Sequence, residues 1–151
     1  MQSSGLKQTG SLKPGRMYFY FYDPKFKDTL PYYDRFPLLL PFDKTSDSFV
    51  GLNLHYLDYK PRMILFQELI KVANAKHIDE NSKLRYNWDM IKSVSKMRMA
   101  GPCVKRYLMN HVRSPFCEVE PQYWHTAVMM PVQKFVGAST STIWKESIRK
   151  S

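Results

Sequence analysis

The first third of the chain carries the period-two hydrophobic pattern of β-strands. Residues 17–22 are all apolar or aromatic, with a tyrosine at every second position, which predicts a strand covered on both faces. Further strands are expected at residues 36–42, where flanking prolines favour a sheet edge, and at residues 49–57. We therefore expect residues 16–58 to form a small antiparallel β unit, preceded by a flexible basic arm over residues 1–15.

After Asp58 the spacing of apolar residues changes to that of helices. Asp58 can cap a helix in which Pro61 occupies the first turn and apolar side chains form a broad stripe. Further helices are expected around Trp88 and over residues 102–112, 121–130 and 140–150, with a short extended piece at residues 116–119. Because strands come first and helices follow, the pattern predicts a single α+β domain over residues 16–151, in which residues 59–151 form about four to five helices.

Basic residues are concentrated in one part of the 151-residue chain. There are 23 Lys and Arg residues against 13 Asp and Glu residues, which gives a formal net charge of +10. Residues 60–113 contain twelve basic and four acidic side chains, whereas residues 17–59 contain four basic and six acidic ones. Clustered cations create a field that concentrates polyanions. The pattern therefore predicts a polyanion-binding face on the helical part of the molecule, with a merely solubilising face as the alternative.

Nucleic acid is the polyanion that this pattern favours. Phosphate contacts need only positive charge along the backbone of the nucleic acid, so we expect binding that does not depend on base sequence. The expected helix at residues 102–112 shows no exposed set of base-reading side chains, which argues against a helix-turn-helix motif. The candidate contacts lie on the predicted helices and near the C-terminus; they are Arg85, Lys92, Lys96, Arg98, Lys105, Arg106, Arg113, Lys145, Arg149 and Lys150.

Aromatic residues of the β unit form a second candidate surface. Tyr18, Tyr20, Tyr32 and Tyr33 are candidates for contact with another protein or for stacking on exposed bases. Packing in the core is the alternative use of such residues.

The sequence contains no strong signal for a cofactor or a metal. None of the six glycines belongs to a phosphate-binding loop, so nucleotide hydrolysis is not expected. Cys103, His111, Cys117 and His125 are separated by eight, six and eight residues, and these spacings do not match the close ligand pairs of zinc sites. We expect no metal and no other cofactor, and the two cysteines fit a reducing compartment.

Two carboxylates form a candidate nuclease site. Glu118 and Glu120 lie on one face of an expected strand, where they could hold a metal ion, but Pro121 follows them and no lysine is near. We therefore expect no enzymatic activity and no small-molecule substrate. No run of about eighteen apolar residues is present, so no membrane partner is expected either.

Several stretches of the sequence are similar to one known family. They are Tyr22–Lys25, Lys27–Leu38, Gly51–Leu57, Pro102–Leu108, His111–Ser114 and Trp144–Ser147. Together they resemble the DNA end-protector proteins of tailed phages of the T-even and cyanophage type, over nearly the whole chain after residue 15. The resemblance implies a protein that binds the terminus of the packaged genome and shields it from host exonuclease on injection. It implies no catalytic residue.

Charge pattern and resemblance together predict a phage virion protein, made in the bacterial cytoplasm. We expect it to bind double-stranded genome DNA at or near its end, independently of sequence, with other virion proteins as partners and a symmetric oligomer as one form of assembly. The alternative is a purely structural protein of the neck, tail or baseplate, in which the aromatic β unit contacts proteins and the basic face meets acidic protein surfaces.

Overall fold

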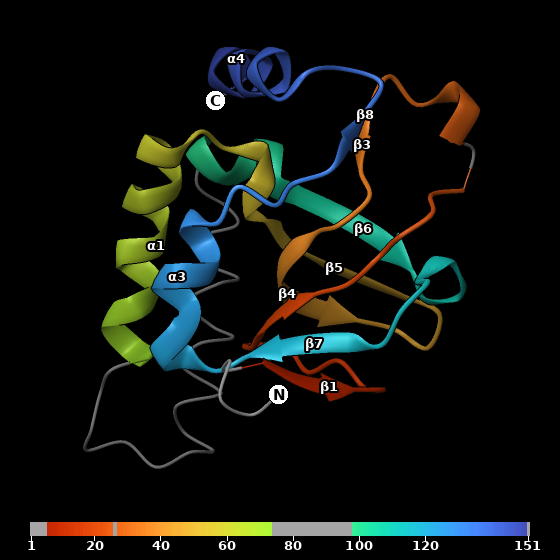
Figure 1. Cartoon of the computed structure of the whole chain (residues 1–151), viewed down its shortest axis with the longest axis vertical. Helices are drawn as coiled ribbons and strands as arrows, with labels where there is room; N and C mark the ends of the chain where they lie inside the picture. Colours follow the sequence, from red (N-terminus) through yellow and green to blue (C-terminus); the bar gives the residue numbers. More distant parts are fainter. Residues whose placement is uncertain (1–5, 26, 74–97, 151) are drawn as a thin grey trace.

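One antiparallel sheet runs through the whole molecule (Figure 1). The computed structural model describes residues 6–25, 27–73 and 98–150. The sheet has six strands in the order β1-β7-β2-β4-β5-β6, and every neighbouring pair is antiparallel. The strands are β1 (Leu6–Thr9), β2 (Met17–Phe19), β4 (Leu38–Lys44), β5 (Ser48–Asn53), β6 (Val104–Leu108) and β7 (Phe116–Val119). A separate two-stranded sheet joins β3 (Tyr33–Asp34) to β8 (Phe135–Val136).

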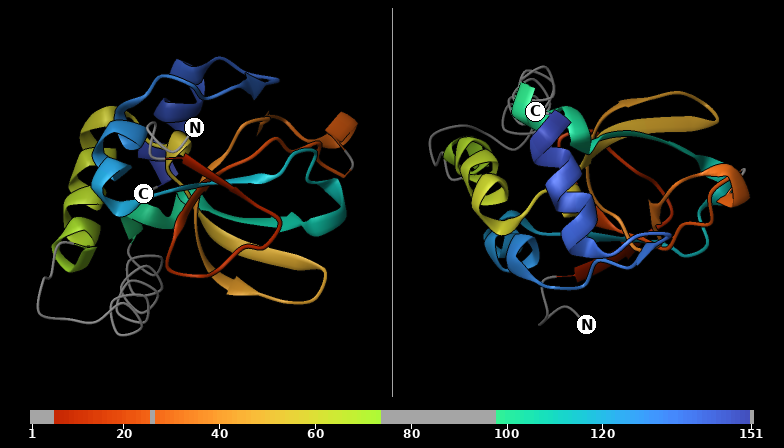
Figure 2. Two further views of the ribbon diagram at one scale, coloured as in Figure 1. Left: turned by 60° about the horizontal axis from the view of Figure 1, so that its bottom comes forward. Right: turned by 90° about the horizontal axis from the view of Figure 1, so that it is seen from above.

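Three α-helices occur in the described part of the chain: α1 (Tyr59–Ala73), α3 (Trp124–Met129) and α4 (Thr140–Lys150). Figure 2 shows α1 and α3 side by side along one side of the curved sheet, with α4 crossing near the start of α1. Short 3-10 helices form several of the connections; they are η2 (Lys27–Thr29), η3 (Leu54–Tyr56), η4 (Arg98–Cys103), η5 (Met109–His111) and η6 (Pro121–Tyr123). Within these residues no helix combines the length and the apolar character needed to cross a membrane.

The predicted separation into a β unit followed by four to five helices is wrong. Strand β7 comes from the last third of the chain but lies between β1 and β2, and β6 lies beside β5. The structure is therefore one α+β domain in which the sheet takes strands from both halves of the sequence. Leu6–Thr9, within the segment expected to be a flexible arm, forms β1 at one edge of the sheet. The helix expected around Trp88 lies outside the described residues.

The expected helix over residues 102–112 is also wrong, because the middle of that segment forms β6 and a 3-10 helix, η5, follows it. Val104 and Leu108 are spaced like neighbours on a helix face, and this spacing suggested the helix. In the structure, all five residues of β6 pair with β5, from Leu52 opposite Val104 to Ser48 opposite Leu108. Backbone pairing with an existing strand and burial of Tyr107 outweigh the weak helical pattern.

The sheet has an apolar core on each of its two faces. On one face, β2, β4 and β5 pack against α1, α3 and α4, and Trp124 is among the buried residues. The other face curves around an aromatic cluster that contains Tyr18, Tyr20 and Phe49. Met17 and Phe19 belong to the first core whereas Tyr18 belongs to the second, so the predicted strand with two covered faces is confirmed for residues 17–19. The strand ends at Phe19, before the predicted end at residue 22.

A buried arginine connects the three helices to one another and to the end of η3. Arg62 of α1 has no exposed surface, and burial lowers the pKa of its guanidinium. Its Nε and Nη2 atoms donate to the carbonyl oxygen of Leu57 at 3.1 and 2.7 Å, and Nη1 donates to that of Val128 at 2.8 Å. The guanidinium also lies over the rings of Tyr59 and Trp144. Because a buried charge needs such partners, Arg62 determines how α1, α3 and α4 meet.

Strands β4 and β5 approach each other closely at Gly51. A Cβ atom at this position would lie 2.7 Å from the carbonyl oxygen of Leu40 and 2.8 Å from Cα of Pro41, both of which are backbone atoms. We expect Gly51→Ala to lower the free energy of unfolding by about 1–3 kcal/mol in urea denaturation, because the strands must move apart. Gly101→Ala is the control, since no atom lies within 4 Å of its Cβ position. Equal stability of the two variants would contradict this account.

Candidate nucleic-acid interface

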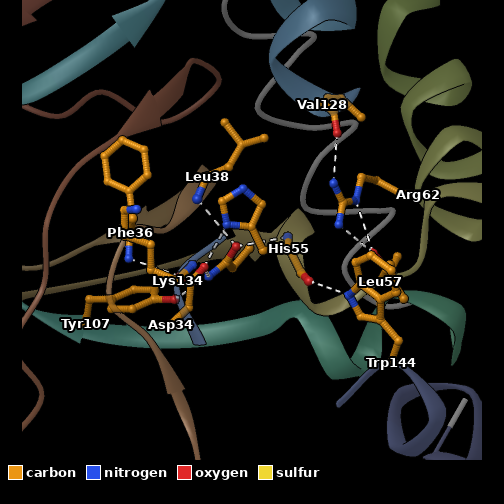
Figure 3. A network of polar contacts seen from close by, with 11 residues as sticks. Asp34, Phe36, Leu38, His55, Leu57, Arg62, Tyr107, Val128, Lys134 and Trp144 are labelled. Atoms are coloured by element: carbon orange, nitrogen blue, oxygen red, sulfur yellow. Dashed lines mark hydrogen bonds and ion pairs between the residues drawn. The ribbon is translucent and has the colours of Figure 1, made fainter. Parts of the chain in front are cut away.

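A buried carboxylate organises the part of the molecule where the candidate site lies (Figure 3). The side chain of Asp34, in β3, has no exposed surface. Its Oδ1 atom accepts hydrogen bonds from the backbone N–H groups of Phe36, at 3.0 Å, and Lys134, at 3.1 Å. Its Oδ2 atom accepts from Nδ1 of His55 at 2.7 Å and from Nδ2 of Asn53 at 3.1 Å. Four donors from three parts of the chain therefore converge on one side chain.

These donors keep Asp34 ionised although it is buried. Burial is the largest influence and by itself would raise the pKa of the carboxyl group. The hydrogen bond and charge of His55, together with the two backbone N–H groups, outweigh burial and hold the pKa of Asp34 below its ordinary value. The carboxylate therefore fixes the β3–β8 pair against the end of β5.

The Asp34–His55 pair has a structural role in this fold. Nε2 of His55 is buried and has no hydrogen-bond partner among the described residues. The ring lies against Phe19 in the core, 6.3 Å between ring centroids, and lines neither of the surface hollows described below. A histidine that acts as a general base needs access to a reacting group, which this position does not provide.

Residues 21–24 follow β2 and are held on both sides by backbone hydrogen bonds. On one side the N–H of Tyr22 donates to the carbonyl oxygen of Arg35 at 3.0 Å. On the other side the N–H of Asp23 donates to the carbonyl oxygen of His111 at 3.0 Å. The hydroxyl of Tyr22 also accepts from the N–H of Leu108 at 2.8 Å. The segment therefore forms a rigid ridge between β3 and the end of β6.

Two hollows of the surface have Tyr22 and Tyr33 in common among their lining residues; together we call them the tyrosine groove. The first, the Phe21 hollow, has a volume of about 520 Å³ and is also lined by Phe21, Asp23, Lys27, Arg35, Arg113 and Val136. The second, the Leu30 hollow, has a volume of about 430 Å³ and is also lined by Pro24, Lys25, Leu30, Tyr32, Asp34, Tyr56, Lys105, Arg106, Tyr107 and Leu108.

Positive charge dominates the tyrosine groove. Each hollow has three cationic side chains: Lys27, Arg35 and Arg113 in the Phe21 hollow, and Lys25, Lys105 and Arg106 in the Leu30 hollow. Asp23 is the partly exposed acid of the lining, and the hydrogen bond that Lys27 donates to it at 3.1 Å lowers the pKa of Asp23. The second acid, Asp34, is buried in its own network. The surface of the groove therefore has an excess of cations.

The tyrosines of the groove add aromatic surface without adding charge. Burial raises the pKa of Tyr22, and burial together with the carboxylate of Asp34 raises the pKa of Tyr56. Both phenols therefore remain neutral at physiological pH. Nζ of Lys105 lies 4.2 Å from the centre of the Tyr56 ring, which combines a cation with an aromatic face at one wall of the Leu30 hollow.

The structure brings together three of the cations expected from the sequence. Lys105 and Arg106 lie on β6 rather than on a helix, and Arg113 follows η5. The others are placed as follows: Arg85, Lys92 and Lys96 fall outside the described residues, Arg98 lies in η4, and Lys145, Arg149 and Lys150 lie on α4. Of the four candidate tyrosines, Tyr18 and Tyr20 are fully buried in the aromatic core, whereas Tyr32 and Tyr33 are half-buried and line the groove.

Sequence reasoning missed half of the cations in the groove. Lys25, Lys27 and Arg35 belong to residues 17–59, a segment whose net charge is slightly negative. The net charge of the segment hid these cations, because Asp34 is buried, Asp43 lies in β4 and Asp47 lies in the β4–β5 turn. The alternation of these cations with aromatic residues was the signal that could have identified them.

The groove has the chemistry of a polyanion-binding surface, and comparison with known proteins agrees with that class. The family model described as Phage T4 terminal DNA protecting protein matches residues 3–147. The chain therefore belongs to the family of phage proteins that protect DNA ends, and this description names a protective role rather than a reaction. Comparisons with curated proteins and with solved structures give no match.

The Asp34 network predicts how stability depends on its carboxylate. Asp34→Ala should lower the free energy of unfolding by about 3–5 kcal/mol, because the His55 donor and two backbone N–H groups lose their buried acceptor. Since the folded-state pKa of Asp34 is lowered, its contribution is present above about pH 4 and is lost as the pH falls through that lowered value.

Asp34→Asn removes this titration and should therefore flatten the acid-side loss of stability, measured by urea denaturation between about pH 4 and pH 2. Asp28→Asn, at an exposed position in η2, is the matched control and should keep the wild-type slope. A wild-type slope in Asp34→Asn would show that the carboxylate does not contribute to acid unfolding.

Proposed function

We propose that the tyrosine groove binds the end of double-stranded phage DNA, independently of base sequence, and thereby denies an exonuclease access to that end. The observation that carries this proposal is the six cations around exposed aromatic and aliphatic surface, in a chain whose family protects DNA ends. The protein would do so as a component of the virion, in place at the genome terminus when the DNA leaves the particle.

The cations account for affinity without sequence preference. Lysine and arginine neutralise phosphates and release counterions, and this contribution to binding is the same for any base sequence. The cations come from both sides of the ridge at Tyr22, so phosphates could be contacted on each side of it. Arg106 and Arg113 are exposed, and Arg106 is oriented by a hydrogen bond from Nη1 to Oγ of Ser48 at 2.9 Å.

The apolar surface of the groove accounts for a preference for ends. Phe21, Leu30 and Val136 are 41%, 41% and 37% exposed, and they are three of the six large apolar side chains that the described residues leave exposed. Inside a duplex, each base pair is covered by its neighbours, so the flat apolar face of a base pair is accessible only at a terminus. A surface that combines apolar groups with cations therefore matches the end of a duplex better than its middle.

Protection then requires no chemistry from the protein. An exonuclease must hold the terminal nucleotide in its own active site, and a protein already covering that nucleotide blocks access. Asp34 lines the Leu30 hollow, but its side chain has no exposed surface, and His55 lines neither hollow. The groove therefore offers cations, phenols and apolar groups rather than a general base.

Charge reversal in the groove tests this proposal. Arg35→Glu combined with Arg106→Glu changes one exposed arginine in each hollow. We expect the affinity for a blunt-ended duplex to fall roughly tenfold or more at low salt, and the log–log salt slope to decrease by about two, because phosphate contacts are lost. Fluorescence anisotropy measures the affinity, and digestion of the same duplex by a processive exonuclease measures protection.

Lys13→Glu combined with Lys60→Glu is the matched control. These exposed lysines, one before β2 and one in α1, give the same change in net charge outside the groove. The control should retain binding and protection, and a duplex whose ends are closed by hairpin loops should bind more weakly than the open duplex. The proposal fails if the control pair loses binding while the groove pair retains it, or if the closed duplex binds equally well.

A further inference from the structure

The Leu30 hollow differs from the Phe21 hollow in both shape and lining. Five tyrosines contribute to its walls: Tyr22, Tyr32, Tyr33, Tyr56 and Tyr107. Its volume of about 430 Å³ lies in the range of sites that bind one small ligand. Three cations, Lys25, Lys105 and Arg106, complete the lining.

We propose that the Leu30 hollow binds a single unpaired nucleotide at the DNA terminus. The base would lie against the tyrosine surface and Leu30, and the adjoining phosphate would contact Lys25, Lys105 or Arg106. This inference rests on the proposed function of the groove and specifies the structure of the DNA end that the groove accepts: a terminus with a nucleotide outside the double helix.

The lining favours stacking over recognition of particular bases. The hydroxyl of Tyr22 already accepts from the N–H of Leu108, and the hydroxyl of Tyr107 accepts from Nδ2 of Asn53 at 3.1 Å. These polar atoms are engaged within the protein, so the aromatic and aliphatic surface supplies most of the contact with a base. Stacking on aromatic side chains tolerates any base, because every base has a π face.

The buried network below the hollow keeps its walls in place. Asn53 bridges Asp34 and Tyr107, donating from Nδ2 at 3.1 Å to each, so β3 and β6 are connected beneath the hollow. The ring of Tyr56 packs at 5.1 Å on Phe135 of β8. A preformed aromatic site loses little entropy when a base enters it, which favours binding of a nucleotide that is already unpaired.

A blunt end and an end with one unpaired nucleotide should bind with different affinities. A blunt end must first unpair and unstack a base before it can enter the hollow, and that step costs free energy. An end with one unpaired nucleotide avoids this cost. Since stacking of one base on aromatic side chains is worth about 1–3 kcal/mol, the end with an unpaired nucleotide should bind roughly tenfold more tightly than the blunt end.

The test measures the ratio of two affinities with the full-length protein. The probes are a blunt duplex and the same duplex with one unpaired 5-iodo-2′-deoxyuridine at its 5′ or 3′ terminus, each with its other end closed by a hairpin loop. Anisotropy gives the affinities, and ultraviolet crosslinking with peptide mapping gives the protein residue beside the unpaired base. We expect the ratio to be roughly ten, and the crosslink to fall on Tyr22, Tyr32 or Tyr33.

Variants of the two hollows separate their roles. Leu30→Trp places a larger side chain at an exposed position of the Leu30 hollow and should reduce the ratio toward one. Val136→Trp makes the matching change in the Phe21 hollow and should leave the ratio unchanged. Circular dichroism and urea denaturation of both variants show whether they fold like the wild-type protein.

Equal affinity of the wild-type protein for the two ends would overturn this inference, as would a crosslink outside the Leu30 hollow. The proposed function would survive that result if the blunt end still bound more tightly than a duplex closed at both ends. If neither open end bound more tightly than the closed duplex, both the inference and the proposed function would fail.

Discussion

The buried carboxylate of Asp34 is the constraint on which the tyrosine groove depends. An ionised group without exposed surface must find donors inside the protein, and here they come from β3, from the end of β5 and from the chain before β8. Tyr33 and Arg35 flank Asp34 in the sequence and line the tyrosine groove. The position of these two surface residues is thus determined by the hydrogen bonds of the buried residue between them.

The sequence predicted the local elements of this fold better than their arrangement. The alternating residues of β2, the strands β4 and β5 and the helix that begins after Asp58 follow from patterns of neighbouring residues. The insertion of β7 between β1 and β2 does not, because strand pairing depends on contacts between residues about a hundred positions apart, as in the ion pair of Arg16 with Glu118. For the same reason β6 was mistaken for a helix.

The residues of the candidate site were also predicted only in part. Lys105, Arg106 and Arg113 were identified because they belong to a segment with a clear excess of cations. Lys25, Lys27 and Arg35 were missed because the net charge of a segment does not reveal which of its charges are buried, paired or exposed. The interpretation of the β unit as a protein-facing side and the helical part as a DNA-facing side had assumed that segments of sequence correspond to faces of the molecule. The groove instead combines residues of both.

The position of β7 between β1 and β2 affects how the protein can fold during synthesis. Strands β1 and β2 cannot both complete their pairing until residues 116–119 have emerged from the ribosome, although they are themselves made first. Such long-range pairing slows folding, because the chain loses conformational entropy when its distant parts meet, before their contacts stabilise the structure. The groove also needs Arg113 and Val136, so a partly synthesised chain contains most of the cations but not the surface. An incomplete chain in a cell full of nucleic acid therefore lacks the surface that we propose for binding a DNA end.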